Sequence, residues 1–256
     1  MVAVATKPKS NGTKVYDLAL LGIGGYAVYK NRTKITNAVV PLKPSASPST
    51  KGLAWYGSDG AWASWAANAE IWFKKMGYDA AWLGASVTSN GMGTYIPIGS
   101  NPADKKTVLA DVAVVPNIYY HLAHGDWLAV QSAAKEWIYA RDWRTAIPPS
   151  KGLFAFIGSC GAFDEPDPVQ SLGGTLTVPN AFLQAYRCVI GYTKIPEMSD
   201  WNTSLPWQNS LFEGLSQGMT VAQAKTYADG KIPEMIGHIK IAGDAQVRLV
   251  GSQLLT

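Results

Sequence analysis

Short apolar runs alternate with segments of helical periodicity along most of the chain. The runs are apolar at consecutive positions, which indicates strands buried on both faces of a mainly parallel sheet. We expect strands at 52–57, 80–84, 118–123, 153–157 and 189–192, with a last one near 239–241. Because helical segments lie between these runs, the pattern predicts an α/β domain with helices on both faces of the sheet.

Three segments carry the helical pattern. Between Trp62 and Met76 apolar residues recur at helical spacing, and Gly77 follows as a stop signal. Residues 127–141 and 206–228 are also expected to be helical. The tryptophans of the first segment are interpreted as core residues rather than as a platform for a ligand.

A proline-rich stretch divides the chain into two unequal parts. Residues 41–51 read PLKPSASPSTK, a composition typical of a linker. We therefore expect residues 1–51 to form an N-terminal tail, a short apolar segment and this linker, and residues 52–256 to form the main domain. The chain has 256 residues, which suits one domain of ordinary size with such an extension.

The apolar segment 18–29 reads LALLGIGGYAVY and has charged residues on both sides. It is shorter than the ~20 residues that a membrane-spanning helix needs, and no signal-peptide cleavage pattern follows it. Three interpretations stay open: membrane association, packing on the main domain, and assembly. The expected location is cytoplasmic, or membrane-associated through residues 18–29.

Composition and charge exclude several classes of protein. Hydrophobic residues make up 47% of the chain and charged residues 16%, which is typical of a globular protein with a large core. The formal net charge is +4, and no basic stripe with interleaved aromatic residues supports nucleic-acid binding. The two cysteines are too few for a disulfide framework, and the histidines lack metal-ligand spacing. We expect no required cofactor and no metal, and the sequence indicates no oligomeric state.

Two reactive side chains each follow a predicted strand. His124-Gly125 comes directly after the run at 118–123, and Cys160 comes shortly after the run at 153–157. In open parallel sheets, ligands bind at the carboxyl ends of the strands. If the two strands are neighbours, the imidazole and the thiol face one cleft.

These residue types suit nucleophilic catalysis. A thiol with the ordinary pKa of about 8.5 is mostly protonated at neutral pH, and a neighbouring histidine can take its proton. His124 and Cys160 are therefore the expected catalytic dyad. The backbone N–H groups of Gly125 and Cys160 are the candidates for an oxyanion hole, since glycine permits close approach of a substrate. Cys188, inside an apolar run, is interpreted as a small buried hydrophobe.

The two strand ends resemble the landmarks of the caspase-like clan (clan CD) of cysteine peptidases, which includes the gingipain, clostripain and metacaspase types. IYYHLAHG at 118–125 is similar to its strand ending in His-Gly, and LFAFIGSCG at 153–161 to its later strand ending in a small residue and Cys. Gly243–Leu249 is similar to the end of gingipain-like domains, so the resemblance covers residues 52–250. It implies a three-layer caspase-like sandwich and a thiol protease, a hydrolase that cleaves protein or peptide substrates through a thioester acyl-enzyme.

The resemblance implies substrate-binding residues less directly. Gly158 stands where clostripain-like members often carry an Asp that binds a basic substrate residue. The clan builds part of its substrate pocket from the loop after the next strand, which here contains Lys194, Glu197, Asp200 and Trp201. The acidic run that begins at Asp164 is interpreted as a solvated loop, with binding of a basic substrate or of calcium as the alternatives.

Two other functions stay open. Gly158-x-Cys160-x-Ala162 is close to the nucleophile elbow of an α/β-hydrolase, with His238 as the downstream histidine. The proline-containing segment after Cys160 is a poor start for the helix that such a fold requires, and His124 would then have no role. The second alternative is a non-catalytic caspase-like domain that serves binding or assembly and is tethered by its N-terminal segment.

Overall fold

The computed structural model describes the main domain with several gaps. The described residues are 51–57, 62–83, 88–89, 95–96, 103–149, 152–164, 176–193 and 203–250. The apolar segment 18–29 and the rest of residues 1–50 lie outside them. Within the described ranges, no helix has both the length and the apolar character that crossing a membrane requires.

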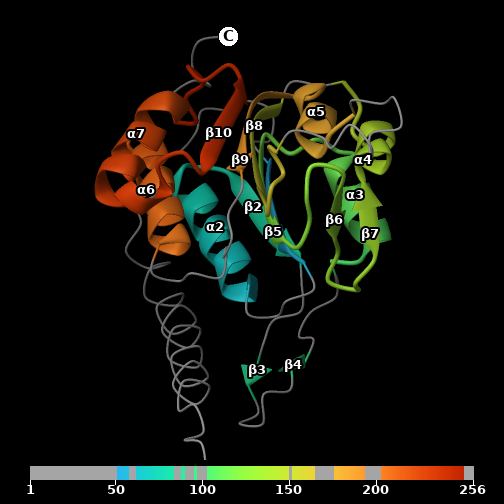
Figure 1. Ribbon diagram of the computed structural model, residues 1–256. Coiled ribbons are helices and arrows are strands. Elements are labelled where there is room, and N and C mark those ends of the chain that lie inside the picture. Colours follow the sequence, from blue (N-terminus) through green and yellow to red (C-terminus); the bar gives the residue numbers. More distant parts are fainter. Residues whose placement is uncertain are drawn as a thin grey trace, which may run out of the picture.

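A six-stranded sheet forms the centre of the molecule (Figure 1). Its strands lie in the order β10-β9-β8-β5-β1-β2, and all neighbours are parallel except β10, which runs antiparallel to β9. The strands are β1 (Lys51–Tyr56), β2 (Asp79–Leu83), β5 (Ile118–Ala123), β8 (Gly152–Ser159), β9 (Tyr186–Tyr192) and β10 (Ile239–Gly243). Two small antiparallel pairs join β3 (Thr88–Ser89) to β4 (Tyr95–Ile96) and β6 (Ala129–Gln131) to β7 (Trp137–Tyr139).

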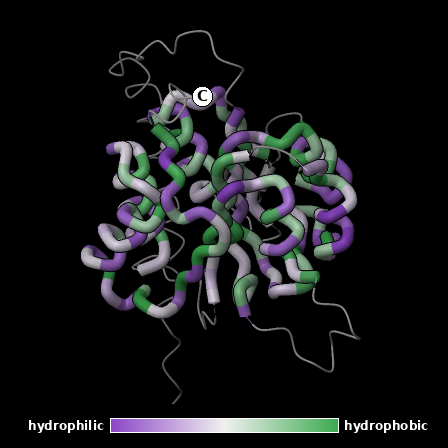
Figure 2. The backbone as a smooth tube through the Cα atoms, turned by 90° about the horizontal axis from the view of Figure 1, so that it is seen from above, coloured by the Kyte–Doolittle hydropathy of each residue, from purple (hydrophilic) through white to green (hydrophobic). Residues whose placement is uncertain are grey.

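Helices cover both faces of this sheet (Figure 1). One face carries α2 (Ala63–Lys75), α6 (Ser204–Ser216) and α7 (Val221–Lys231), and the other carries α3 (Lys105–Val112), α4 (Ala140–Ala146) and α5 (Val178–Leu183). A 3-10 helix, Pro233–Met235, leads into β10. Hydrophobic and hydrophilic positions alternate along the outer helices, as expected of helices that cover a core (Figure 2). The protein is a three-layer α/β sandwich with a mostly parallel sheet, which confirms the predicted architecture.

The central strands are apolar throughout because their alternate side chains enter two separate core clusters. On β8, Phe154 and Phe156 belong to the cluster beneath α2 and α6, whereas Ala155 and Ile157 belong to the cluster beneath α4 and α5. All four side chains are fully buried. Trp65 of α2 is buried in the first cluster, so this tryptophan is a core residue as expected.

The prediction of a helix over 127–141 is wrong. This segment contains the β6–β7 hairpin and reaches only the first residues of α4. In β7, Trp137 and Tyr139 are exposed and Ile138 is buried, an alternation with the period of two that is typical of a strand.

The prediction of a single helix over 206–228 is also wrong, because the structure contains two helices there. Gly218, with φ of +82°, follows the end of α6 in a conformation that favours glycine. The Thr220 hydroxyl oxygen then accepts a hydrogen bond from Gln223 N, and the Gln223 side chain bonds to Thr220 N. This reciprocal cap starts α7 as a new helix.

Candidate functional site

The order of the strands creates a switch point between β1 and β5. From β1 the chain continues to β2 on one side, and then passes to β5 on the other side, from which β8 and β9 follow outward. Ligands of open α/β sheets bind at the carboxyl ends of the strands at such a point. Functional side chains are therefore expected at the edge formed by the ends of β1, β5 and β8.

The sheet register places the backbones of His124 and Cys160 at neighbouring strand ends on this edge. Strands β5 and β8 are paired in parallel up to their last residues, and His124 and Cys160 are the next residue on each. Both lie four positions beyond the registered pair Tyr120–Phe156, so their side chains emerge on the same face as those two rings. Neighbouring strands of a sheet are ~4.8 Å apart, so the two strand ends that carry these residues are adjacent.

His124 is an exposed side chain on a well-anchored backbone. Its carbonyl oxygen accepts a hydrogen bond from Gln131 N at 2.7 Å, which ties it to β6. Its ring meets the Trp62 ring in an edge contact, with centroids 4.6 Å apart and planes at 61°. Trp62 directly precedes α2 and is only 4% exposed, so a fixed aromatic surface orients the imidazole.

Gly125 offers a backbone N–H at the same edge. It lies opposite Val130 in an antiparallel bridge, and the neighbouring hydrogen bonds use the residues on either side of it. At such a position the N–H points away from the partner strand, and within the described residues it makes no backbone hydrogen bond. A Cβ on Gly125 would collide with the carbonyl oxygen of Ala129, so the hairpin requires glycine there.

Cys160 is a free, half-buried thiol. Burial raises the pKa of this thiol above its ordinary value, its own backbone N–H opposes this by bonding to the sulfur, and the negative charge of Asp164 raises the pKa further. The sulfur is therefore protonated at neutral pH, and a nucleophilic sulfur needs a base to remove its proton. His124, directly after the neighbouring strand β5, is the candidate for this base.

Of the predicted substrate-binding residues, Asp164 lies at the site. Its N–H donates to the Gly161 carbonyl oxygen at 2.9 Å, and its Oδ1 accepts a hydrogen bond from the Thr193 hydroxyl at 2.7 Å. These two bonds fold the carboxylate back toward Cys160. The other predicted contacts lie outside the described residues, namely Lys194, Glu197, Asp200 and Trp201.

Gly158 is explained by packing between strands. A Cβ on this residue would collide with the carbonyl oxygen of His121 on β5. The position therefore cannot hold the Asp of the clostripain type without moving β8 away from β5. Glycine at this position is therefore a requirement of the sheet.

The remaining cysteine and histidines are placed apart from the His124–Cys160 pair. Cys188 is fully buried on β9, where burial raises the pKa of its thiol to about 12. His238 directly precedes β10, and β9 lies between that strand and β8. The α/β-hydrolase alternative, which needs His238 beside Cys160, has no support in this arrangement.

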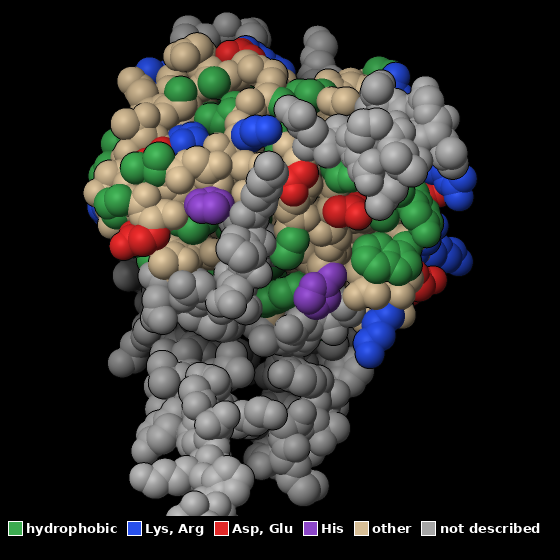
Figure 3. Space-filling view, in the orientation of Figure 1, with side chains coloured by type: hydrophobic (Ala, Val, Ile, Leu, Met, Phe, Trp, Pro, Cys, Tyr) green, Lys and Arg blue, Asp and Glu red, His purple; other side chains and the backbone are tan. Residues whose placement is uncertain are grey.

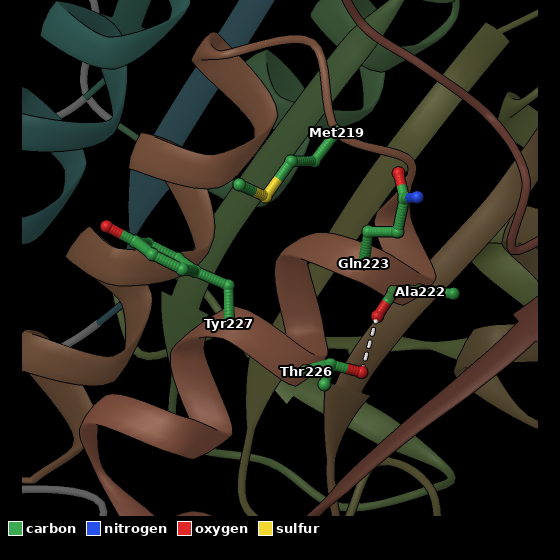
Figure 4. A pocket seen from close by; sticks show the side chains of 5 residues that line it. All are labelled: Met219, Ala222, Gln223, Thr226 and Tyr227. Atoms are coloured by element: carbon green, nitrogen blue, oxygen red, sulfur yellow. Dashed lines mark hydrogen bonds between the residues drawn. The ribbon is translucent and has the colours of Figure 1, made fainter.

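No group of three or more metal-ligating side chains is found in the part of the chain that the structure describes. A shallow depression lies on the outer surface of α7 (Figure 4). It is lined by Met219, Ala222, Gln223, Thr226 and Tyr227. None of these is a predicted site residue, and the Thr226 hydroxyl bonds to the Ala222 carbonyl oxygen of its own helix.

Comparisons with known proteins find similarity among solved structures alone. No protein-family model matches the chain, and no curated protein matches it. Among solved structures, a pyridoxal kinase from Staphylococcus aureus in complex with AMP-PCP is 10% identical, with a TM-score of 0.32 over 77% of this chain and 99% of that chain. A second structure of the pyridoxal kinase from Staphylococcus aureus is 11% identical, with a TM-score of 0.29 over 77% of this chain and 98% of that chain.

These comparisons contradict the predicted family and activity. The solved structures described above are kinases, and no family model or curated protein supports a caspase-like peptidase. The prediction of a clan CD thiol protease, and of hydrolase activity on protein substrates, is therefore wrong. TM-scores near 0.3 do not establish a common fold, so no kinase activity follows from them.

Two residues of the site were missed by the sequence. Trp62 was interpreted only as core, although it also contacts the His124 ring. Its position as the residue that opens the helix after β1, next to the switch point, is the signal that indicates this role. Thr193, which holds Asp164, gives no such signal because it is 29 residues away along the chain.

Proposed function

We propose that the carboxyl edge of the sheet binds a small carbonyl compound, with Cys160 as the nucleophile and His124 as its base. The observation that carries this proposal is the register of β5 and β8, because His124 and Cys160 each directly follow the last registered pair of these two strands. The Gly125 N–H supports it, because a donor at this edge suits the oxygen of a carbonyl group that is under attack.

The chemistry is a reversible addition. The Cys160 sulfur forms a bond to the carbonyl carbon while the C=O double bond opens, and the thiol proton passes to the His124 imidazole. The developing oxyanion accepts a hydrogen bond from Gly125 N and then takes the proton from the imidazolium. The product is a hemithioacetal, no group leaves, and the reverse steps restore the free thiol and the ligand.

The test measures how fast iodoacetamide alkylates each cysteine of the native protein, with peptide mapping to separate Cys160 from Cys188. We expect Cys160 to react faster than Cys188, which is buried and serves as an internal control. In His124→Gln, the rate at Cys160 should fall about 10²-fold, the lower end of what a general base contributes. Propanal should protect Cys160 of the unchanged protein from alkylation, and dilution of the propanal should restore the rate.

Either of two results contradicts the proposal. One is an unchanged Cys160 rate in His124→Gln, because the imidazole would then take no part in removing the thiol proton. The other is a lack of protection by propanal at concentrations that trap a free thiol in solution. Retained secondary structure of the variant, measured by circular dichroism, shows that a lost rate is not lost folding.

A further inference from the structure

Two exposed aromatic side chains lie next to each other on β7. Trp137 is 44% exposed and Tyr139 is 36% exposed, whereas Ile138 between them is fully buried. Successive side chains of a strand point to opposite faces, so the two rings share one face and are about 6.6 Å apart along the strand. In the part of the chain that the structure describes, no other Trp, Tyr or Phe side chain is exposed to this degree.

A cation stands at each end of this aromatic pair. Arg141 is the second residue of α4, and its guanidinium carbon lies 5.4 Å from the centroid of the Tyr139 ring. Lys135 lies in the turn between β6 and β7, two residues before Trp137. Its φ of +63° is a left-handed conformation that favours glycine. The turn therefore keeps a lysine in a strained conformation, and strain of this kind is common at binding sites.

The acidic side chains next to this surface bond to other parts of the fold. Glu136 Oε2 accepts a hydrogen bond from Lys105 N, at the start of α3, at 2.8 Å. Asp142 Oδ2 forms an ion pair with Lys105 Nζ at 2.7 Å. Among the described residues, neither Lys135 nor Arg141 forms an ion pair with an acidic side chain. The two cations that flank the rings can therefore attract an anion.

Further basic side chains surround this surface. Figure 3 shows Lys and Arg side chains toward the right-hand edge of the drawn face, where α3, α4 and β7 lie. Lys106 of α3 and Arg144 of α4 are exposed. The expected helix over 127–141 hides this arrangement, because residues two apart point to different sides of a helix. The observed strand joins basic and aromatic residues in one surface, which revises the expectation that the chain has no such stripe.

We propose that the β7 face, formed by Lys135, Trp137, Tyr139 and Arg141, binds single-stranded nucleic acid. Neighbouring bases stack on the two aromatic rings, and phosphates pair with the cation at each end. An unpaired strand offers both the flat base faces and the negative charges that this surface requires. In a duplex the bases are stacked on one another and do not reach the rings. This surface is separate from the Cys160 site, and the inference does not depend on the proposed thiol chemistry.

The experiment measures how tightly the full chain binds a fluorescein-labelled oligothymidylate, by fluorescence anisotropy at several salt concentrations. Trp137→Ala should weaken binding about tenfold, because stacking of one base contributes roughly this much. Trp137→Phe keeps an aromatic ring and should recover most of the affinity. Lys135→Ala should lower the slope of log Kd against log salt concentration by about 0.7, the value for one phosphate of a single strand.

Tyr227→Ala is the matched control, because it removes a ring that also contacts a cation, the Lys231 Nζ at 4.4 Å, on α7 across the sheet. It should leave the affinity unchanged. Unlabelled duplex DNA and oligoglutamate should each compete about tenfold less well than unlabelled oligothymidylate, since neither offers free base faces. An oligouridylate of the same length distinguishes the two natural sources: tighter binding than oligothymidylate assigns RNA to the surface, and weaker binding assigns DNA.

Several results overturn the inference. One is a lack of oligothymidylate binding at low salt. Another is an unchanged affinity in Trp137→Ala, because attraction between charges alone would then explain the binding. Equal competition by oligoglutamate or by the duplex would show a surface for anions in general. Equal losses in Trp137→Ala and Tyr227→Ala would show that the β7 face is not the place of contact.

Discussion

Two histidines three residues apart, His121 within β5 and His124 directly after it, occupy opposite environments. His121 is fully buried between aromatic rings, with its Nδ1 3.0 Å from the Tyr119 hydroxyl and its ring centroid 5.0 Å from that of Trp55. Burial lowers the pKa of its imidazole to about 3. His124 lies at the strand end on the other face, exposed and in contact with Trp62. The same side chain thus serves the core in one place and is available for chemistry in the other.

The two cysteines repeat this contrast. Cys188 lies within β9 and is fully buried, whereas Cys160 lies one residue beyond the end of β8 and is half-buried. In each pair, one residue is accessible to solvent, namely His124 and Cys160, and both of these residues follow directly after a strand. A residue's place relative to the strand end therefore decides its role here more than its type does.

The largest predicted effect is a difference in protein stability between substitution of His121 and substitution of His124. His121→Ala should lower the free energy of unfolding by about 2–5 kcal/mol, because it leaves a cavity beside Trp55 and Trp143 and removes one of the two hydrogen-bond partners of the Tyr119 hydroxyl. His124→Ala should lower it by less than about 1 kcal/mol, as expected of an exposed side chain. Urea denaturation measures the free energy of unfolding of both variants. Equal losses in His121→Ala and His124→Ala would contradict the predicted difference between the buried and the exposed histidine.

The next effect is the dependence of stability on pH. His121 has a folded-state pKa of about 3, below the 6.5 of an ordinary histidine, so the unfolded chain binds more protons between these values. Stability from this group is fully present above pH 6.5 and is lost as the pH falls toward 3, by up to roughly 1.4 kcal/mol per pH unit. Between pH 6.5 and 5, the decrease in the free energy of unfolding with falling pH should disappear in His121→Gln and persist in His124→Gln.

Two carboxylates with a lowered pKa titrate below that pH range, and Asp111, whose pKa is raised by burial, is present in both histidine variants and so does not affect their comparison. Hydrogen bonds to backbone or side-chain donors lower the pKa of Asp104 and Asp244 from 3.8, so these groups lose their contribution only at more acidic pH. A slope of equal size in His121→Gln and the unchanged protein would show that another group is responsible.

The smallest effect concerns the contact that orients His124. An aromatic pair of this kind contributes about 0.5–1.5 kcal/mol, so Trp62→Ala should slow alkylation of Cys160 by roughly two- to tenfold. Trp62→Phe keeps an aromatic ring and should restore most of the rate. If both variants lose the same amount of rate, or if Cys188 becomes reactive in either, Trp62 acts through the core and not through the imidazole.

The architecture could be predicted from the sequence because strands that are buried on both faces are apolar at consecutive positions. The expected strand 118–123 has the same bounds as β5, since each of its residues enters one of the two cores. The β6–β7 hairpin was missed because its three-residue strands are too short to show their period of two. The segment 206–228 forms two helices because Thr220 caps the start of α7. The spacing of three residues between Thr220 and Gln223 is the sequence signal of this cap.

The site was predictable only in part. The sequence places His124 and Cys160 after two predicted strands, and the structure makes these strands parallel neighbours that end at a common edge, whereas the chemical role of the two residues stays a prediction. The peptidase family was inferred from short strand-end motifs whose meaning depends on the surrounding structure, and the comparisons contradict it. The bond from Thr193 to Asp164, and the collision that makes Gly158 necessary, join residues from different strands. Such contacts exist only after folding and leave no local pattern.

The central claim, that His124 and Cys160 form one site, is tested most directly by nuclear magnetic resonance of the imidazole rings. The chain has three histidines, so each ring signal can be assigned by substitution. Blocking Cys160 with iodoacetamide should shift the ring signals of His124 and leave those of His238 unchanged, because β9 separates His238 from the thiol. His124 signals that stay in place when Cys160 is blocked would contradict the account.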